Sequence, residues 1–191
     1  MKTLLIENST GRGTLAVADE NEILLRREFG KSGELAWAIE ETFLTLGVPD
    51  EIVVGIGPGS YTGLRVASAM AVGIEAGIGC PAYGCPSVLG YPGVSYHVVG
   101  DARLGTVFFA SVDDRRITRG PELLPVEEFR ELRPRLGKAP LFAIGPVPGC
   151  EELEVVRPAA EYLGRCRESF VQTLEPLYLK EPHVTVKRQA G

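Results

Sequence analysis

The sequence has few of the residues that build metal sites, disulfide frameworks or membrane spans. Its two histidines, His97 and His183, are far apart and form no His-x-x-x-His pair, so no metal site is predicted. Its four cysteines form no Cys-x-x-Cys pair, which favours free thiols in a reducing cytoplasm. The apolar run at residues 4–6 is too short for a signal-peptide core or a membrane span, so no membrane association is expected.

Positive charge is also scarce. The chain of 191 residues carries 20 Lys and Arg against 25 Asp and Glu, a formal net charge of −5. A domain that grips phosphates by itself usually has a basic excess or a basic face, so strong direct binding of nucleic acid is not expected. Arg115, Arg116 and Arg119 cluster near one predicted loop, and a solvated face is the favoured interpretation of that cluster.

The apolar patterns predict an α/β fold made of two halves. In the first half the order β-β-β-α-β-α-β is typical of a ribonuclease-H-like unit. Its expected elements are strands at 3–7, 14–18 and 23–29, a helix at 32–46 with Ser32 as N-cap and Gly47 as stop, a strand at 52–56, a helix at 62–79 and a strand at 81–84.

A Gly/Pro-rich passage at 86–93 separates this unit from a second one. We therefore predict an N-terminal half at 1–92 and a shortened C-terminal half at 93–191. The elements expected in the second half are strands at 95–100, 106–112 and 140–144, an amphipathic stretch at 127–136 and a helix at 159–172. The two halves are expected to face each other.

The first predicted helix carries two lines of apolar residues along its surface, whereas packing against a single core would need only one such line. Residues 35, 39, 43 and 46 form the first line, and Trp37 and Leu44 form the second. The helix at 62–79 is apolar almost all round, with Arg65 and Glu75 as its only charges. This much apolar surface predicts a protein interface.

The most informative segment, residues 55–65, reads Gly-Ile-Gly-Pro-Gly-Ser-Tyr-Thr-Gly-Leu-Arg between a buried strand and a helix. It lacks the Gly-Lys-Ser/Thr ending of a phosphate loop, and Ser60 stands where G-x-G-x-x-G requires its third glycine. A tight strand-to-helix turn with Ser60 as helix cap is the favoured interpretation. A triad of Ser60, His97 and Asp101 is disfavoured because no G-x-S-x-G elbow is present.

The segment Gly-Pro-Gly-Ser-Tyr-Thr-Gly-Leu-Arg resembles the Gly-Pro-Gly-Ser-Phe-Thr-Gly-Leu-Arg signature of the TsaB (YeaZ) family. The start Ile6-Glu7-Asn8-Ser9-Thr10, the segment Asp101-Ala102-Arg103 and the segment Pro176-Leu177-Tyr178-Leu179 are similar too. In relatives, residues 101–103 would form an edge of the interdomain cleft. By default, however, Asp101 forms a turn by bonding its own backbone two residues on. The resemblance covers about residues 1–118 and the end of the chain.

This resemblance implies an actin/hexokinase-like superfold and a non-catalytic subunit with no cofactor of its own. Such subunits bind the catalytic homologue TsaD and, through the complex, the ATPase TsaE, in the threonylcarbamoyladenosine modification of tRNA. Alone, the subunit is expected to form a homodimer, and strong direct binding of tRNA is not expected.

The resemblance and the apolar pattern together mark two groups of site residues. The family-motif turn consists of Gly57, Pro58, Gly59, Ser60, Thr62 and Gly63. The partner interface is expected to consist of Trp37, Leu44, Tyr61, Arg65, Ala67, Ser68, Ala71 and Val72. Many family members have lysine at position 72 and glycine at position 67, so this helix face is drier and more crowded than usual.

Two other functions remain open from the sequence. One is a small-molecule kinase of the same superfold that uses Mg-ATP; it would need a phosphate-binding aspartate, where Glu7 stands here, and a second phosphate loop. The other is a stand-alone homodimeric interaction protein that uses the same helices. Identification of the partner distinguishes that protein from a TsaD-binding subunit.

Overall fold

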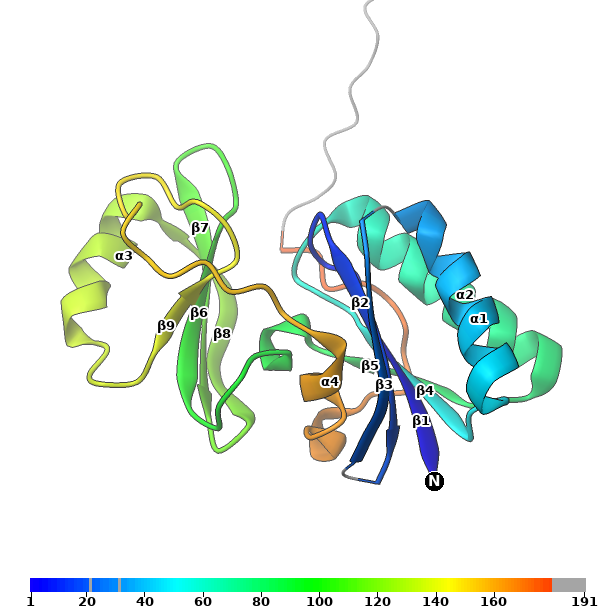
Figure 1. Cartoon of the computed structure of the whole chain (residues 1–191). Helices are drawn as coiled ribbons and strands as arrows, with labels where there is room; N and C mark the ends of the chain where they lie inside the picture. The colour runs from blue at the N-terminus through cyan, green and yellow to red at the C-terminus, as the bar shows by residue number, and fades with distance from the viewer. Residues whose placement is uncertain (21, 31, 180–191) are drawn as a thin grey trace, which may run out of the picture.

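The computed structural model describes residues 1–20, 22–30 and 32–179, which form two β-sheets with helices packed on them (Figure 1). The first sheet has five strands in the order β3-β2-β1-β4-β5. They are β1 (Lys2–Glu7), β2 (Gly13–Asp19), β3 (Glu22–Phe29), β4 (Glu51–Gly55) and β5 (Ala82–Cys85). β1 to β3 are antiparallel, whereas β4 and β5 run parallel to β1. All five predicted strands are confirmed within a few residues.

Helices α1 (Leu35–Leu46) and α2 (Tyr61–Ile78) lie side by side on one face of this sheet (Figure 1). The predicted core line of α1 is confirmed, because Leu35 and Ile39 are buried and the later members of the line pack against the same core. Gly47 ends α1 with a φ of 77° and donates its N–H to the Phe43 carbonyl. At the other end, a 3-10 turn (Ser32–Glu34) precedes α1, so the α-helix begins three residues later than predicted. The predicted N-cap side chain of Ser32 lies outside the described residues.

The second sheet has four strands in the order β8-β7-β6-β9. Its elements are β6 (Tyr96–Asp101), β7 (Thr106–Asp113), β8 (Arg116–Pro125), α3 (Val126–Leu132), a 3-10 turn (Arg133–Arg135) and β9 (Leu141–Ala143). β8 was not predicted, since its sequence RITRGPELLP holds charges, Gly and Pro rather than an apolar alternation. Of the three arginines expected near one loop, Arg115 lies in the turn before β8, whereas Arg116 and Arg119 belong to the strand. In that strand Arg119 pairs with Glu122, and Arg116 pairs with Glu168 across the surface.

After β9 the chain returns to the first sheet. α4 (Ala160–Leu163) packs against β1 and β2 on the face opposite α1 and α2, and the Ala160 N–H donates to Thr14 Oγ1 at 2.8 Å. Further along, Val171 pairs with Gly84, and the Leu177 N–H donates to the Ile56 carbonyl at 2.7 Å. Residues from both ends of the chain thus build the first half, and the boundary at 92/93 stays a prediction.

The predicted helix at 159–172 is wrong in extent. α4 has four residues and is followed by a 3-10 turn (Arg167–Ser169). Gly164 ends the helix and lies so close to the sheet that an added Cβ would be 3.1 Å from Leu5 Cδ1. The chain leaves the helical path here because it must follow the surface of the sheet, which overrides the apolar spacing of Tyr162, Cys166 and Phe170.

One apolar core joins the two sheets. Leu5 and Val53 of the first sheet share a buried cluster with Val98 and Phe108 of the second sheet and with Leu163 of α4. Alternate residues of β1 point to the opposite face, where they meet α1 and α2. Each face of the first sheet is therefore covered, which explains the continuous apolar runs of its central strands.

The four cysteines are free thiols, and all are buried. Within the described ranges no helix is both long and apolar enough to cross a lipid bilayer. The cytoplasmic location stays a prediction.

The buried carboxylate of Glu51 ties the returning segment to β4. It accepts two hydrogen bonds from Arg167, at 2.6 and 2.9 Å, and one from the Thr3 hydroxyl at 2.8 Å. We expect Arg167→Ala to lower the free energy of unfolding by about 1–2 kcal/mol, because it leaves a buried carboxylate short of donors. The matched control is Arg116→Ala, whose partner Glu168 is exposed, with an expected effect below about 0.5 kcal/mol. Urea denaturation measures both, and equal losses would contradict the expectation.

Candidate functional site

The family-motif turn connects the end of β4 to the start of α2. Gly57 adopts a φ of 103°, a region that side chains disfavour, and the Ser60 hydroxyl accepts the Gly63 N–H at 3.3 Å. Ser60 is therefore the N-cap of α2, and the interpretation as a tight strand-to-helix turn is confirmed.

The turn lies against the end of β1. The Ser60 N–H donates to the Ser9 carbonyl at 2.7 Å, and the Asn8 side-chain amide donates to the Gly63 carbonyl at 3.0 Å. A Cβ on Gly59 would lie 2.2 Å from the Ser9 carbonyl oxygen, and one on Gly63 would lie 2.0 Å from that of Asn8. Both glycines are required by this close backbone approach, whereas Thr62 in the same turn is exposed.

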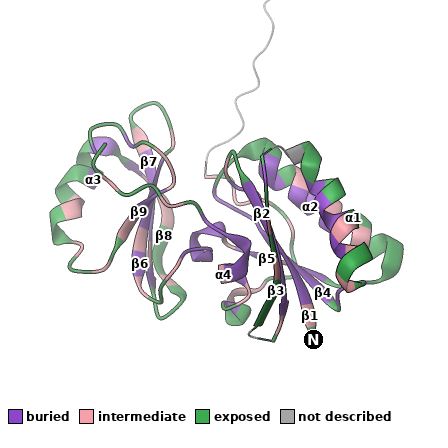
Figure 2. Ribbon diagram, viewed as in Figure 1, coloured by how far each residue is buried: buried purple, intermediate pink, exposed green. Residues whose placement is uncertain are grey.

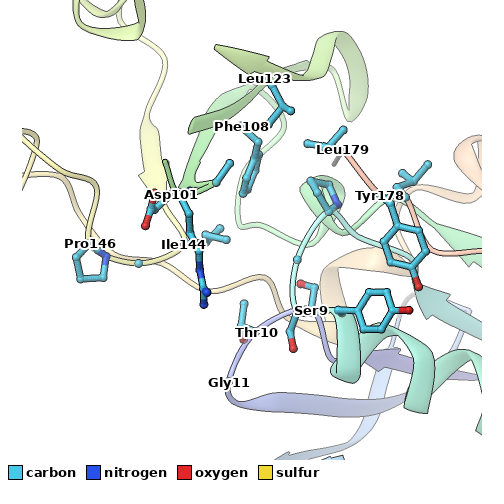
Figure 3. Close-up of a pocket in the computed structure, with 18 residues that line it drawn as sticks. Ser9, Thr10, Gly11, Asp101, Phe108, Leu123, Ile144, Pro146, Tyr178 and Leu179 are labelled. Carbon is cyan, nitrogen blue, oxygen red and sulfur yellow. Dashed lines mark hydrogen bonds between the residues drawn. The ribbon is translucent and has the colours of Figure 1, made fainter. Parts of the chain in front are cut away.

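A cleft of about 860 Å³ opens between the two halves beside the turn (Figure 3). Its polar side comes from the β1–β2 turn, the family-motif turn and the end of β6. Its apolar side comes from the second sheet and from the last described residues. The lining residues are Ser9, Thr10, Gly11, Pro58, Gly59, Ser60, Tyr61, Asp101, Ala102, Arg103, Phe108, Leu123, Ile144, Gly145, Pro146, Leu177, Tyr178 and Leu179.

The segment 101–103 fits both interpretations of its sequence, a local turn and an edge of the cleft between the two halves. The Arg103 N–H donates to Asp101 Oδ1 at 2.7 Å, which is the local turn expected by default. The same three residues line the cleft, as the resemblance implied. His97, in contrast, is not among the lining residues. Its ring nitrogens contact the Ser111 hydroxyl and the Leu136 carbonyl, so no triad with Ser60 is assembled.

An aromatic clamp joins α2 to the returning end of the chain at the mouth of the cleft. The rings of Tyr61 and Tyr178 are 5.2 Å apart, and the Arg65 guanidinium lies 4.0 Å from the Tyr61 ring centre. The Arg65 Nε–H donates to the Tyr178 hydroxyl at 2.9 Å, which raises the pKa of Arg65 further. Arg65 and Tyr61, expected at the partner interface, thus also hold residues 177–179 beside the cleft.

Glu7, which the resemblance placed where a kinase of this superfold would need aspartate, does not line the cleft. It is 2% exposed, and burial raises the pKa of its carboxyl group. Its Oε1 accepts the Ser9 N–H at 2.7 Å, while Oε2 is directed toward Gly55 on β4. A carboxylate turned into the protein core is badly placed to position a metal-bound phosphate.

α1 and α2 each carry buried and exposed stretches (Figure 2), and the residues expected at the partner interface fall into both groups. Trp37 is 59% exposed and Leu44 is 81% exposed on the outer face of α1, and Tyr61, Arg65 and Val72 are exposed on α2. Ser68 is buried, and Ala67 and Ala71 are fully buried on the same helix. The two alanines face the sheet, so in this structure their side chains support α2 from below rather than form its surface. The assignment of the five exposed residues of α1 and α2 to a partner interface stays a prediction.

Sequence reasoning missed the part of the cleft that the second sheet and the β1–β2 hairpin turn contribute. Phe108, Leu123 and Ile144 come from three strands or strand ends of the second sheet, and Gly11 comes from a hairpin turn. No local spacing joins segments this far apart, so only the fold brings them together. Among the described residues no group of His, Cys, Asp and Glu is arranged to hold a metal ion, and His183 lies outside them.

Two β-sheet halves with a cleft between them agree with the expected actin/hexokinase-like fold. Within that class the fold of the chain is similar to that of YeaZ. YeaZ from Pseudomonas aeruginosa superposes with a TM-score of 0.71 at 20% identity, covering 93% of this chain and 99% of that chain. An uncharacterised protein described as similar to peptidase YEAZ from Pseudomonas aeruginosa superposes with a TM-score of 0.73 at 20% identity, and the superposition covers 94% of this chain and 99% of that chain. The ethanolamine utilisation protein EutJ from Carboxydothermus hydrogenoformans is more distant. Its TM-score is 0.52 at 13% identity, with 86% of this chain and 89% of that chain covered.

The match to a family model falls on the first half of the chain. Residues 34–92 match the family model of TsaD, tRNA N6-adenosine threonylcarbamoyltransferase, and this range holds α1, the family-motif turn and α2. Uncharacterised proteins of Mycobacterium tuberculosis and Mycobacterium bovis are 38% identical over 87 residues, or 44% of this chain. The match spans 41% of the length of these curated relatives.

Proposed function

We propose that this chain is a TsaB-type, non-catalytic subunit that binds the catalytic homologue TsaD in the threonylcarbamoyladenosine modification of tRNA. One observation carries the proposal. α1 and α2 present exposed Trp37, Leu44 and Val72, and both helices lie on the part of the chain that matches the TsaD family model. Aromatic and aliphatic side chains that a fold leaves exposed together mark an interaction surface.

The composition supports a subunit that relies on partners. With a net charge of −5, the chain is poorly suited to hold tRNA by itself, so the partner is expected to provide the tRNA-binding surface. The ATPase TsaE would be reached through the complex. When TsaD is absent, the same α1–α2 face is expected to pair with its own copy, as isologous surfaces do.

The cleft is the observation that favours the alternative of a Mg-ATP-dependent kinase, because ligands of many folds bind between two lobes. Against a kinase, the carboxylate of Glu7 is buried away from the cleft. Phosphoryl transfer depends on charged groups that face the phosphates. We therefore assign no catalytic residue and no cofactor to this chain.

Co-expression with the TsaD subunit of the same genome, followed by affinity purification, tests the proposal. The two chains are expected to elute together in a fixed ratio. Elution of this chain as a homodimer without TsaD would overturn the proposal in favour of a stand-alone interaction protein. A phosphate-release assay with Mg-ATP tests the kinase alternative, which a turnover of about one per second or more would support.

A further inference from the structure

Arg65 is the only cation of the helix pair α1 and α2. The charged residues of α1 are glutamates, and α2 carries Glu75 besides Arg65. Positions 69, 72 and 76 of α2 follow Arg65 at helical spacing, and they are exposed Ala, Val and Ala. A single positive charge therefore stands on an otherwise uncharged helix face.

The fold fixes the position of Arg65 without neutralising its charge. The guanidinium carbon lies 4.0 Å from the Tyr61 ring centre and 5.9 Å from that of Tyr178, and the Nε–H donates to the Tyr178 hydroxyl at 2.9 Å. Arg167, in contrast, meets the buried carboxylate of Glu51. Among the described residues no carboxylate pairs with the exposed Arg65, so the N–H groups of its terminal nitrogens face solvent.

A partner that covers this face must supply an anion. Burial of a guanidinium is costly unless acceptors of the partner replace its water. A carboxylate does so best, because its two oxygens match the planar N–H pair and such charge-assisted hydrogen bonds are roughly twice as strong as neutral ones. The contacts with two tyrosines already restrict the rotamers of Arg65, so less conformational entropy is lost on binding.

We propose that Arg65 is the anion-recognition point of the partner interface: an aspartate or glutamate of the partner protein binds its terminal N–H groups, and Tyr61 and Tyr178 form the rim of this ion pair. The inference rests on the proposed function, because it requires TsaD to cover α1 and α2. It adds the returning end of the chain to the interface, since Tyr178 is 37% exposed. A protein carboxylate is favoured over an RNA phosphate because one cation on this helix pair is too little charge to hold a polyanion.

Affinity measurements with purified TsaD test the role of the charge. Arg65→Gln should weaken the complex by at least about 30-fold, as expected when one partner of a buried charge pair is removed. Arg65→Lys keeps the charge but loses the planar fork, so it should bind several-fold more weakly than the wild type. The melting temperature of the free chain should change little, because the hydrogen bond from the Leu177 N–H to the Ile56 carbonyl still holds the returning segment.

The matched control is Arg135→Gln. Arg135 is also exposed, but it lies in the 3-10 turn after α3, on the opposite side of the molecule from α1 and α2 (Figure 1). This variant should bind TsaD as tightly as the wild type.

Carbodiimide coupling identifies the anion directly, because it joins a carboxylate to an amine but not to a guanidinium. In the complex of the Arg65→Lys variant with TsaD, the introduced amine should form an amide with an aspartate or glutamate of TsaD. Mass spectrometry of the digested complex locates this link. The introduced amine of Arg135→Lys should form no link to TsaD.

The outcomes separate this inference from the proposed function. If the wild-type chain does not bind TsaD, the proposed function is overturned and the inference falls with it. If the wild type binds and Arg65→Gln binds equally tightly, or if the amine at position 65 couples to no carboxylate of TsaD, only the inference is overturned. An effect of Arg65→Gln that appears only when tRNA is present would assign the anion to RNA and would also overturn it.

Discussion

Trp37→Ala is expected to weaken binding to TsaD, and homodimer formation in its absence, by at least about tenfold, or roughly 1.4 kcal/mol. Truncation of an aromatic residue at the centre of an interface commonly costs about 2 kcal/mol or more. Trp37 is 59% exposed in the free chain, so its own fold draws little stability from it, and the buried line of α1 stays in place. The melting temperature should therefore change little. Titration calorimetry with TsaD and sedimentation of the chain alone measure the two affinities.

Two leucines that are each 81% exposed provide a matched control. Leu44 lies on α1 beside Trp37, whereas Leu104 lies at the β6–β7 hairpin tip, away from the α1–α2 face. Leu44→Ala should reduce affinity and Leu104→Ala should not. If Leu104→Ala has the larger effect, or if Trp37→Ala lowers the melting temperature and leaves affinity unchanged, the interface lies elsewhere.

Gly63→Ala is expected to destabilise the fold by about 3 kcal/mol, because overpacking against backbone cannot relax as it can against a flexible side chain. The added methyl group would lie 2.0 Å from the Asn8 carbonyl oxygen, so α2 and the end of β1 would have to separate. For a chain of this length the melting temperature should fall by roughly 6–12 °C. Differential scanning calorimetry measures the fall.

Gly73→Ala makes the same change ten residues further along α2, with the opposite expected effect on stability. Gly73 is an exposed residue of α2, and a Cβ there meets nothing within 4 Å. Alanine in a helix interior is favoured over glycine by about 0.5–1 kcal/mol, so this variant should be slightly more stable than the wild type. If both variants shift stability in the same direction, the close approach of α2 to β1 does not decide the role of Gly63.

The sequence predicted the first half of the fold well because most strands of the first sheet are buried on both faces and its helices are strongly patterned. After Glu51, β4 is an uninterrupted apolar run that ends in the glycine- and proline-containing turn, and Leu35 and Ile39 repeat at helical spacing. The second half was predicted less completely. β8 carries Arg119, Gly120 and Pro121 at its centre, and its pairing with β7 decides its structure more than its own propensity does.

The site was predicted only where it is continuous along the chain. The family-motif turn and its cap could be recognised because the glycines and Ser60 lie next to each other in sequence. Ala67 and Ala71 show where the pattern fails: their spacing marks a helix face, but it does not say whether a sheet of the same chain or a partner covers that face. Glu7 could be recognised as unusual from the sequence, but its orientation away from the cleft required the structure.

The return of the chain to the first sheet has a consequence for folding during synthesis. β1 and β2 emerge early from a ribosome, yet the helix that covers one of their faces, α4, lies at Ala160–Leu163. Until those residues emerge, Leu5, Ala16 and Val53 lack part of their cover, so the N-terminal segment must wait with an exposed apolar face. The period between synthesis of β5 and of α4 is therefore when this chain is most exposed to aggregation.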